Sequence, residues 1–284
     1  MNELMFEIIG VEMNEIKRIT GILHTYSKKA KEQILQVGST IFQSEGISGL
    51  EEELFPCMDE LIKNAVKANY KFVLIIEKLV DRLKTEYSDI SDEKVEEMIS
   101  DIIKNKDVYD ITAAEIAETE NISKTVREIL NEESVQLKIK NSAYEKNCEI
   151  SDADVERLNS LKKINRIHTL LSKRKVKVII KIESDNQFIF IEVTNTAPII
   201  AKDLNRIYAK RDEFKIYRDE NREHEFFINN LDTSESGFGL GYATIDSTLA
   251  NMGLDPFKTI QILAASDTTV ILSIPIDIMK SRVV

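Results

Sequence analysis

The first 45 residues of the chain are largely polar, with apolar residues spaced by about one helical turn. These apolar residues are Ile16, Ile19, Ile22 and Leu23. The spacing predicts one long helix within residues 1–45. The turn-prone run Ser-Glu-Gly-Ile-Ser-Gly at 44–49 then predicts a break. We therefore expect residues 1–49 to form an N-terminal helical segment.

A second helix is predicted over residues 51–69, where apolar residues again follow helical spacing. The stripe consists of Leu54, Met58, Leu61, Ile62, Ala65 and Val66. Such a stripe is typical of an amphipathic helix that buries one face. Away from the stripe, Glu60, Asn64 and Lys67 lie four and three positions apart, so they project from one side as a polar face.

Residues 70–174 are helical in pattern and heavily charged. Capping signals that predict helix starts occur at Ser91, at Thr112 with Glu115, and at Ser151 with Asp154. A stripe that predicts a buried helix face then runs through Val155, Leu158, Leu161, Ile164, Ile167 and Leu171.

The hydrophobic period changes at residue 176 from that of a helix to that of a strand. Two hairpins are predicted from strands over 176–182, 188–193, 257–263 and 269–276. Between them, residues 199–235 are mixed and charged, and Tyr242–Met252 predicts a helix that Gly253 ends in the usual C-cap position. The C-terminal half is therefore expected to be α+β, with an antiparallel or mixed sheet covered by helices.

Composition narrows the class of protein. Of the 284 residues, 43% are apolar and 31% are charged, and the formal net charge is −11. This acidic balance argues against a broad nucleic-acid surface, which needs a basic stripe. The two cysteines, Cys57 and Cys148, lack metal-site spacing and fit a reducing cytoplasm. Because neither a signal peptide nor an apolar run of about 18 residues is recognisable, we expect a cytoplasmic protein that does not span a membrane.

Glycines are concentrated at one place in the chain. Of nine glycines, none lies between Gly49 and Gly237, and then Gly237, Gly239 and Gly241 fall within five residues. Glycine permits close backbone approach, so this loop before a helix can direct N–H groups at an anion such as a polyphosphate. The alternative is a flexible loop or a tight helix entry.

The polar face of the 51–69 helix offers a second part of such a site. Asn64 carries a neutral oxygen suited to Mg²⁺, which retains several of its waters. Glu60 is a candidate base for orienting a nucleophile. For a lone charged helix, the alternative is a solvated face.

Four segments together resemble the GHKL ATPase superfamily of gyrase, the heat-shock chaperone ATPases, mismatch-repair proteins and histidine kinases. Residues 60–67 resemble the asparagine box, 190–199 the first glycine box, 236–243 the second glycine box, and 268–275 the closing strand of the histidine-kinase version. The resemblance covers residues 50–69 and 175–280. It implies a two-layer α/β sandwich of the Bergerat type that binds ATP and Mg²⁺.

The resemblance also implies a role for each matching residue. Asn64 would hold the Mg²⁺, and Glu60 would be the general base. Thr268 would lie near the adenine, and residues 199–235 would form a mobile lid. The full set of implied ATP-binding positions is Asn64, Lys67, Asn195, Ala197, Gly237, Phe238, Gly239, Leu240, Gly241 and Thr268.

Two departures from the family pattern stand out. Asn195 replaces the aspartate that binds the adenine amino group, which weakens that hydrogen bond by about 1 kcal/mol, and Ala197 and Ile199 replace glycines. The other departure is a helical insertion at about 71–174 that interrupts an ATPase domain over 50–284. The insertion must bury its own stripes, so it is either a small subdomain or a partner-docking arm.

A phosphoacceptor box has a histidine followed by an acidic residue on a dimerisation helix, and none of the three histidines matches it. His224 is followed by Glu225 but lies in the segment 199–235, and His168 is followed by threonine. His24, followed by Thr25 on the expected N-terminal helix, is the candidate, and the alternative is an ordinary helix-surface histidine. Two functions remain. The first is a histidine-kinase-like signalling protein. Its N-terminal helices dimerise or present His24, or it phosphorylates a separate protein such as a response-regulator-like substrate. The second is a catalytically weak, nucleotide-gated protein-binding module.

Overall fold

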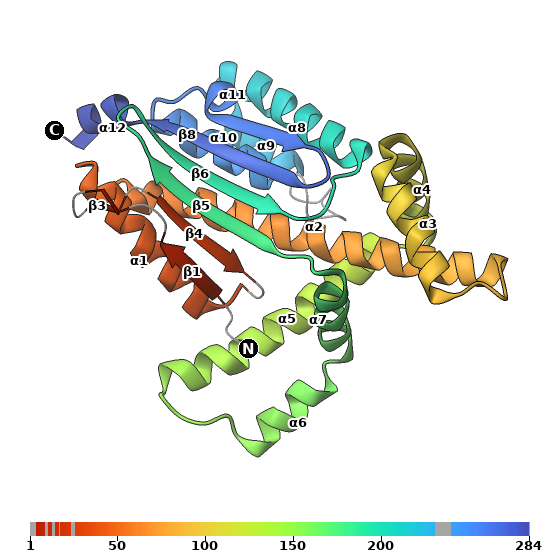
Figure 1. The fold of residues 1–284 in the computed structure, drawn as a ribbon. Coiled ribbons are helices and arrows are strands. Elements are labelled where there is room, and N and C mark those ends of the chain that lie inside the picture. Colours follow the sequence, from red (N-terminus) through yellow and green to blue (C-terminus); the bar gives the residue numbers. More distant parts are fainter. Residues whose placement is uncertain are drawn as a thin grey trace. The chain divides into compact units, whose positions relative to one another are not determined.

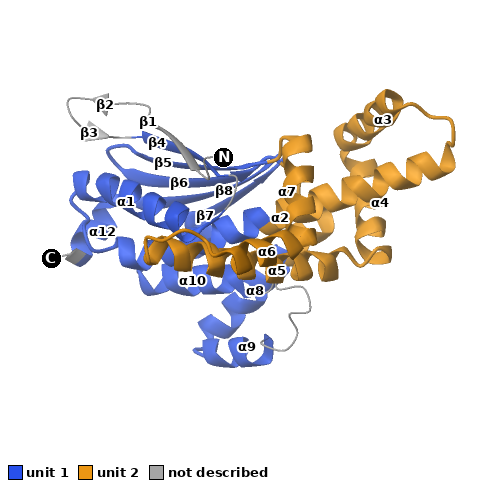
Figure 2. Ribbon diagram, turned by 90° about the horizontal axis from the view of Figure 1, so that it is seen from below, with its two compact units in different colours: residues 1–66, 177–196, 207–284 blue, residues 67–176, 197–206 orange. Residues whose placement is uncertain are grey.

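The protein forms two compact units (Figure 2). The structure, a computed structural model, describes residues 4–8, 11–12, 15–16, 18–23, 26–230 and 240–283. Unit 1 comprises residues 1–66, 177–196 and 207–284, and unit 2 comprises residues 67–176 and 197–206. Helices α2 (Glu51–Glu86) and α8 (Ala201–Asp219) contribute residues to both units.

Unit 1 is built on an antiparallel sheet with the strand order β1-β4-β5-β6-β8-β7 (Figure 1). In that order the strands are Leu4–Ile8, Arg18–Leu23, Val178–Ser184, Phe188–Asn195, Thr268–Pro275 and Ile260–Ala264. A two-residue pairing joins β2 (Val11–Glu12) to β3 (Glu15–Ile16). Side chains of β5, β6 and β8 alternate between buried and half-buried, as in a sheet with one face in the core. Both predicted hairpins are confirmed, except that residues 257–259, predicted as strand, lie in the short helix α11 (Pro256–Thr259).

Helices behind the sheet in Figure 1 cover its buried face. They are α1 (Lys28–Ser44), the first half of α2 and α10 (Gly241–Asn251), and α12 (Ile276–Val283) joins the same core. Phe42, Leu61 and Ile191 are at most 2% exposed in this core. Gly253, with a φ of 75°, follows α10 as predicted. The α+β class and the sandwich of one sheet with a helical layer are therefore confirmed.

Two helices occupy much of the mixed segment 199–235, and the sequence pattern did not predict them. They are α8 and α9 (Glu223–Asn230). Phe214 and Phe226, with ring centroids 5.1 Å apart, pack with Ala243 of α10 in a small second core. The apolar stripe of α8 is short, because its buried residues are only Phe214 and the cation Arg211.

Unit 2 is helical, as predicted for the insertion. Its complete helices are α3 (Asp92–Lys104), α4 (Lys106–Thr119), α5 (Ile122–Glu145), α6 (Asp152–Ser160) and α7 (Lys162–Arg174). The predicted N-caps Ser91 and Ser151 are confirmed, because each hydroxyl accepts a backbone N–H of the following turn. Inside this unit the Tyr70 hydroxyl donates to Glu133 at 2.7 Å.

The predicted N-terminal helix is wrong for Leu4–Ile8, Val11–Glu12 and Glu15–Ile16, which form β1, β2 and β3, and for residues 18–23, which form β4. Ile19 and Leu23 are buried with the period of a strand, and Leu23 lies opposite Val178 of β5. Pairing with β5 satisfies backbone groups of both strands, and this tertiary contact outweighs the helix-like spacing of a few isoleucines. The helical part of this region begins only after the N-cap Ser27.

The predicted helix start at Thr112 is also wrong. Thr112 lies inside α4, which begins after the N-cap Asn105. Tyr109 and Ile116, on either side of Thr112, are both buried, so one continuous helix buries more apolar surface than two short ones would.

The long apolar stripe from Val155 to Leu171 is not one buried face. The α6 helix has no buried residue and ends at Ser160, and Val155 is 43% exposed. The buried positions are Ile164, Ile167 and Leu171 of α7. Leu161, which joins the two helices with non-helical backbone, interrupts the stripe.

A cluster around Asp59 links α1 to α2 inside unit 1. The Tyr26 hydroxyl donates to Asp59 at 2.6 Å, and Lys31 and Lys63 lie 3.0 and 2.7 Å from its carboxylate. Burial alone would raise the pKa of Asp59, but hydrogen bonds from the two lysines and the tyrosine lower it below its ordinary value. The ionised carboxylate therefore stabilises the fold.

We predict that Asp59→Asn lowers the free energy of unfolding at neutral pH and flattens its acid dependence. A group whose pKa is depressed by folding contributes stability above its unfolded pKa, about 4, and loses it as the pH falls through the folded value. Urea unfolding between about pH 2 and 7 measures this. Exposed Asp89 provides the control, because Asp89→Asn should keep the parent's pH profile. Equal profiles for Asp59→Asn and the parent would contradict the prediction.

Candidate functional site

Glu60 of α2 lies directly against the N-terminus of α10. A β-carbon at position 241 would stand 2.2 Å from Glu60 Oε1 and 2.9 Å from its Cδ. No such separation is possible between real atoms, so the carboxylate occupies space that only glycine leaves open. The structure thus brings together Glu60 and Gly241, which are far apart in the sequence.

The N-terminus of α10 is suited to an anion. Its first turn contains no acidic side chain, and Leu240 at the N-cap makes no side-chain capping hydrogen bond. The first N–H groups of a helix and its dipole both favour negative charge. The Glu60 carboxylate lies in that field, and Asn64 follows it by one turn on α2.

Asn195 and Thr268 lie side by side at the ends of two neighbouring strands. They are directly opposite in the β6–β8 register, and each is 5% exposed. Asn195 ends the buried row of β6, two residues after Val193. Thr268 begins the buried row of β8, two residues before Val270. An amide and a hydroxyl at the edge of an apolar core can recognise a flat ligand with polar edges.

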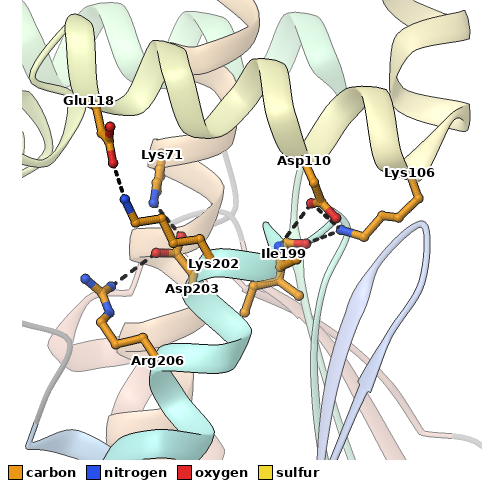
Figure 3. A network of polar contacts seen from close by, with 9 residues as sticks. Lys71, Lys106, Asp110, Glu118, Ile199, Lys202, Asp203 and Arg206 are labelled. Carbon is orange, nitrogen blue, oxygen red and sulfur yellow. Dashed lines mark hydrogen bonds and ion pairs between the residues drawn. The ribbon is translucent and has the colours of Figure 1, made fainter.

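Residues 197–206 belong to unit 2 and are held there by a polar network (Figure 3). Asp110 accepts the backbone N–H of Ala201 at 3.0 Å and so caps α8. Lys106 donates to Asp110 at 2.8 Å and to the carbonyl oxygen of Ile199. The start of the segment 199–235 is therefore bound to α4.

Charged pairs extend this network along the first turns of α8. Lys71 pairs with Asp203, and Lys202 pairs with Glu118 (Figure 3). Lys71 and Asp203 have side chains only 14% and 19% exposed, so their pair is poorly screened by solvent. These contacts fix a stretch that the family resemblance assigns to a mobile lid.

Ala197 stands where the family resemblance would have a glycine, and it is 1% exposed. Packed positions of this kind need side chains rather than the conformational freedom of glycine. Lys67 also belongs to unit 2, as its first residue on α2.

A buried ion pair between α8 and α10 is a feature that the sequence did not reveal. Arg211 and Asp246 have side chains 3% and 0% exposed, and Nε and Nη2 each lie 2.9 Å from a carboxylate oxygen. Nη2 also donates to the Pro256 carbonyl at 3.0 Å. Burial raises the pKa of Asp246, and Arg211 opposes that rise. Nothing in the spacing of these two residues singles them out from the surrounding charged positions.

Some predicted site residues fall outside the described part of the chain. These are Gly237, Phe238, Gly239 and the phosphoacceptor candidate His24. Leu240, at the described end of the loop, packs against the cluster of Phe214 and Phe226.

Within the described ranges, no group of three or more histidine, cysteine, aspartate and glutamate side chains is placed to bind a metal ion. A search of the same ranges finds no helix with the length and apolar character to cross a membrane. No protein-family model, curated protein or solved structure matches the chain.

We predict that the effect of Gly241→Ala on stability depends on Glu60. With Glu60 present, the new methyl group displaces the carboxylate from the α10 N-terminus, which removes an interaction worth about 0.3–1 kcal/mol. In a Glu60→Ala background, the same glycine replacement should stabilise the helix by about 0.5–1 kcal/mol, because alanine is the better helix former. Urea unfolding of the four proteins measures the coupling.

The control cycle pairs Gly241→Ala with Glu52→Ala, which removes an exposed carboxylate from α2, the helix that carries Glu60. The effects of these two changes on the free energy of unfolding should be additive. Additive effects of Gly241→Ala and Glu60→Ala would show that the carboxylate does not depend on the glycine.

Proposed function

We propose that unit 1 binds ATP with Mg²⁺, the phosphates at the N-terminus of α10 and the adenine near Asn195 and Thr268. The observation that carries the proposal is the contact of Glu60 with Gly241. It joins the helix that resembles the asparagine box to the helix that follows the second glycine box. Two segments singled out by motif alone are thus neighbours in the fold.

The sheet gives independent support for a fold of the Bergerat type. Helices cover one face of an antiparallel sheet, and Asn195 and Thr268 interrupt the buried side of its central strands. Polar side chains at the edge of an apolar core suit a ligand site. In this proposal the side chains of Asn195 and Thr268 contact the adenine. Ala197 lies two residues after Asn195 and belongs to the segment that resembles the first glycine box.

The residues at the phosphate end fit a magnesium ion. Asn64 would supply an amide oxygen from the same face of α2 as Glu60, and Mg²⁺ commonly binds through one or two protein oxygens together with phosphates and waters. When bound, the ion neutralises phosphate charge. Because position 241 is glycine, the Glu60 carboxylate can lie against the N-terminus of α10, beside the place that we propose for the phosphates.

Glu60 is the residue to which we assign the general base. Its carboxylate is already held at the positive end of α10, where an attacking hydroxyl, imidazole or water would meet the terminal phosphate. From there it would accept the proton of the nucleophile or orient it. This arrangement supports phosphate transfer to a separate partner protein, such as a response-regulator-like substrate.

The second candidate is a nucleotide-gated binding module with weak catalysis. The observation that favours it is the network around Ile199 and Asp203, which holds the start of the lid segment inside unit 2. An ATPase that must close a lid over its substrate needs that segment to move. A dimer, in either case, would have to use a surface other than the apolar face of α1, because that face is buried in unit 1.

We predict that Asn64→Ala and Glu60→Gln separate nucleotide binding from turnover. Asn64→Ala should weaken Mg-ADP binding at least about tenfold, because it removes an oxygen from the metal. Glu60→Gln should keep the affinity of the parent and lower phosphate release or transfer from ATP by about 100-fold or more, the usual scale for a general base. Isothermal titration and radiolabelled ATP measure the two quantities.

Asn251→Ala is the matched control, since Asn251 is exposed at the other end of α10. It should leave both quantities unchanged. No heat of binding for the parent at millimolar Mg-ADP would contradict the site. Binding without any turnover in the parent would favour the binding module over the kinase.

A further inference from the structure

A groove lies on unit 1 between the second half of α8 and the turn that joins α10 to α11 (Pro256–Thr259). Its volume is about 430 Å³, and its walls include Lys215, Arg218, Leu254 and Phe257. This volume is within the usual range of ligand sites. The groove is at the C-terminal end of α10, about 16 Å of helix from Gly241. It is therefore separate from the proposed nucleotide site.

Two cations in the groove have unused bonding capacity. Lys215 and Arg218 follow Arg211 on one stripe of α8, four and seven positions on. Whereas Arg211 is neutralised by Asp246, Lys215 forms no ion pair within the described part of the chain. Arg218 forms an ion pair with the adjacent Asp219 through Nη2, at 3.3 Å, but its Nη1 has no hydrogen-bond partner among the described residues. A guanidinium nitrogen left in this way favours an incoming anion.

An aromatic surface lies next to these cations. Phe257 is 37% exposed, and its ring is in contact with the guanidinium of Arg211, 4.7 Å from the ring centroid. Lys215 Nζ lies over the same ring at 5.3 Å. Asp255, which also lines the groove, accepts the Phe257 N–H at 3.0 Å and lies 3.7 Å from Lys258. The groove thus combines an apolar platform with positive charge.

We propose that this groove binds an acidic segment of a partner protein. A carboxylate of the segment pairs with Arg218 and Lys215, and a neighbouring apolar or aromatic side chain packs on Phe257. The chain has a net charge of −11 and therefore repels acidic partners in general. Binding of an acidic segment thus depends on this local positive site. The proposal does not rest on nucleotide binding.

The test is fluorescence anisotropy of the full chain, without nucleotide, with a labelled peptide Gly-Glu-Glu-Phe-Glu-Glu-Gly. Two further probes replace either the glutamates by glutamines or the phenylalanine by serine. The acidic phenylalanine probe should bind at least about fivefold more tightly than either. Its affinity should fall as salt rises from about 50 to 500 mM, because screening weakens exposed charge pairs.

Variants locate the binding. Lys215→Gln with Arg218→Gln should weaken the acidic probe at least about tenfold. Lys258→Gln is the matched control, because Lys258 is 86% exposed, carries the same charge and lies beside the groove without lining it. Lys215→Gln alone changes an exposed side chain, so it tests the site if the double variant fails to fold.

Equal affinity for all three probes would overturn the proposal, as would a loss in Lys258→Gln equal to that in the double variant. Self-association of the parent that the double variant abolishes would assign the groove to a second copy of the chain and would also overturn it. Sedimentation equilibrium of both proteins measures that outcome.

Discussion

The buried face of the antiparallel sheet is the constraint on which unit 1 depends. Apolar residues of β4, β5, β6 and β8 form one continuous surface, and α1, α2 and α10 must cover it. Once they do so, the polar side of α2 and the first turn of α10 are brought to the same place. The contact of Glu60 with Gly241 is a consequence of that packing, and it explains why a carboxylate and a glycine so distant in sequence are neighbours.

Unit 2 includes a short stretch of chain, residues 197–206, that begins two positions after Asn195 and runs into the first turns of α8. Ala197 and Ile200 are buried, and Lys106 donates both to Asp110 and to the carbonyl oxygen of Ile199. These contacts with the helical insertion hold the chain where α8 begins.

Much of the architecture could be predicted from the sequence, because its local patterns agree with the fold. The stripe of the 51–69 helix, the two hairpins and Gly253 after α10 are examples. β4 could not be recognised, since Ile19 and Ile22 have helical spacing and only pairing with β5 makes them a strand. The Arg211–Asp246 pair was also out of reach, because a salt bridge between distant helices leaves no periodic signal. The roles of Asn64, Asn195 and Thr268 remain predictions.

Photolabelling with 8-azido-ATP in the presence of Mg²⁺, followed by peptide mapping, tests whether unit 1 binds the adenine near Asn195 and Thr268. The azide is attached to the adenine ring, so the label reports where the base lies. We expect labelled peptides from the ends of β6 and β8, around Asn195 and Thr268, and loss of the label when unmodified ATP competes. Competed labelling confined to other parts of the chain, or labelling that ATP does not reduce, would contradict it.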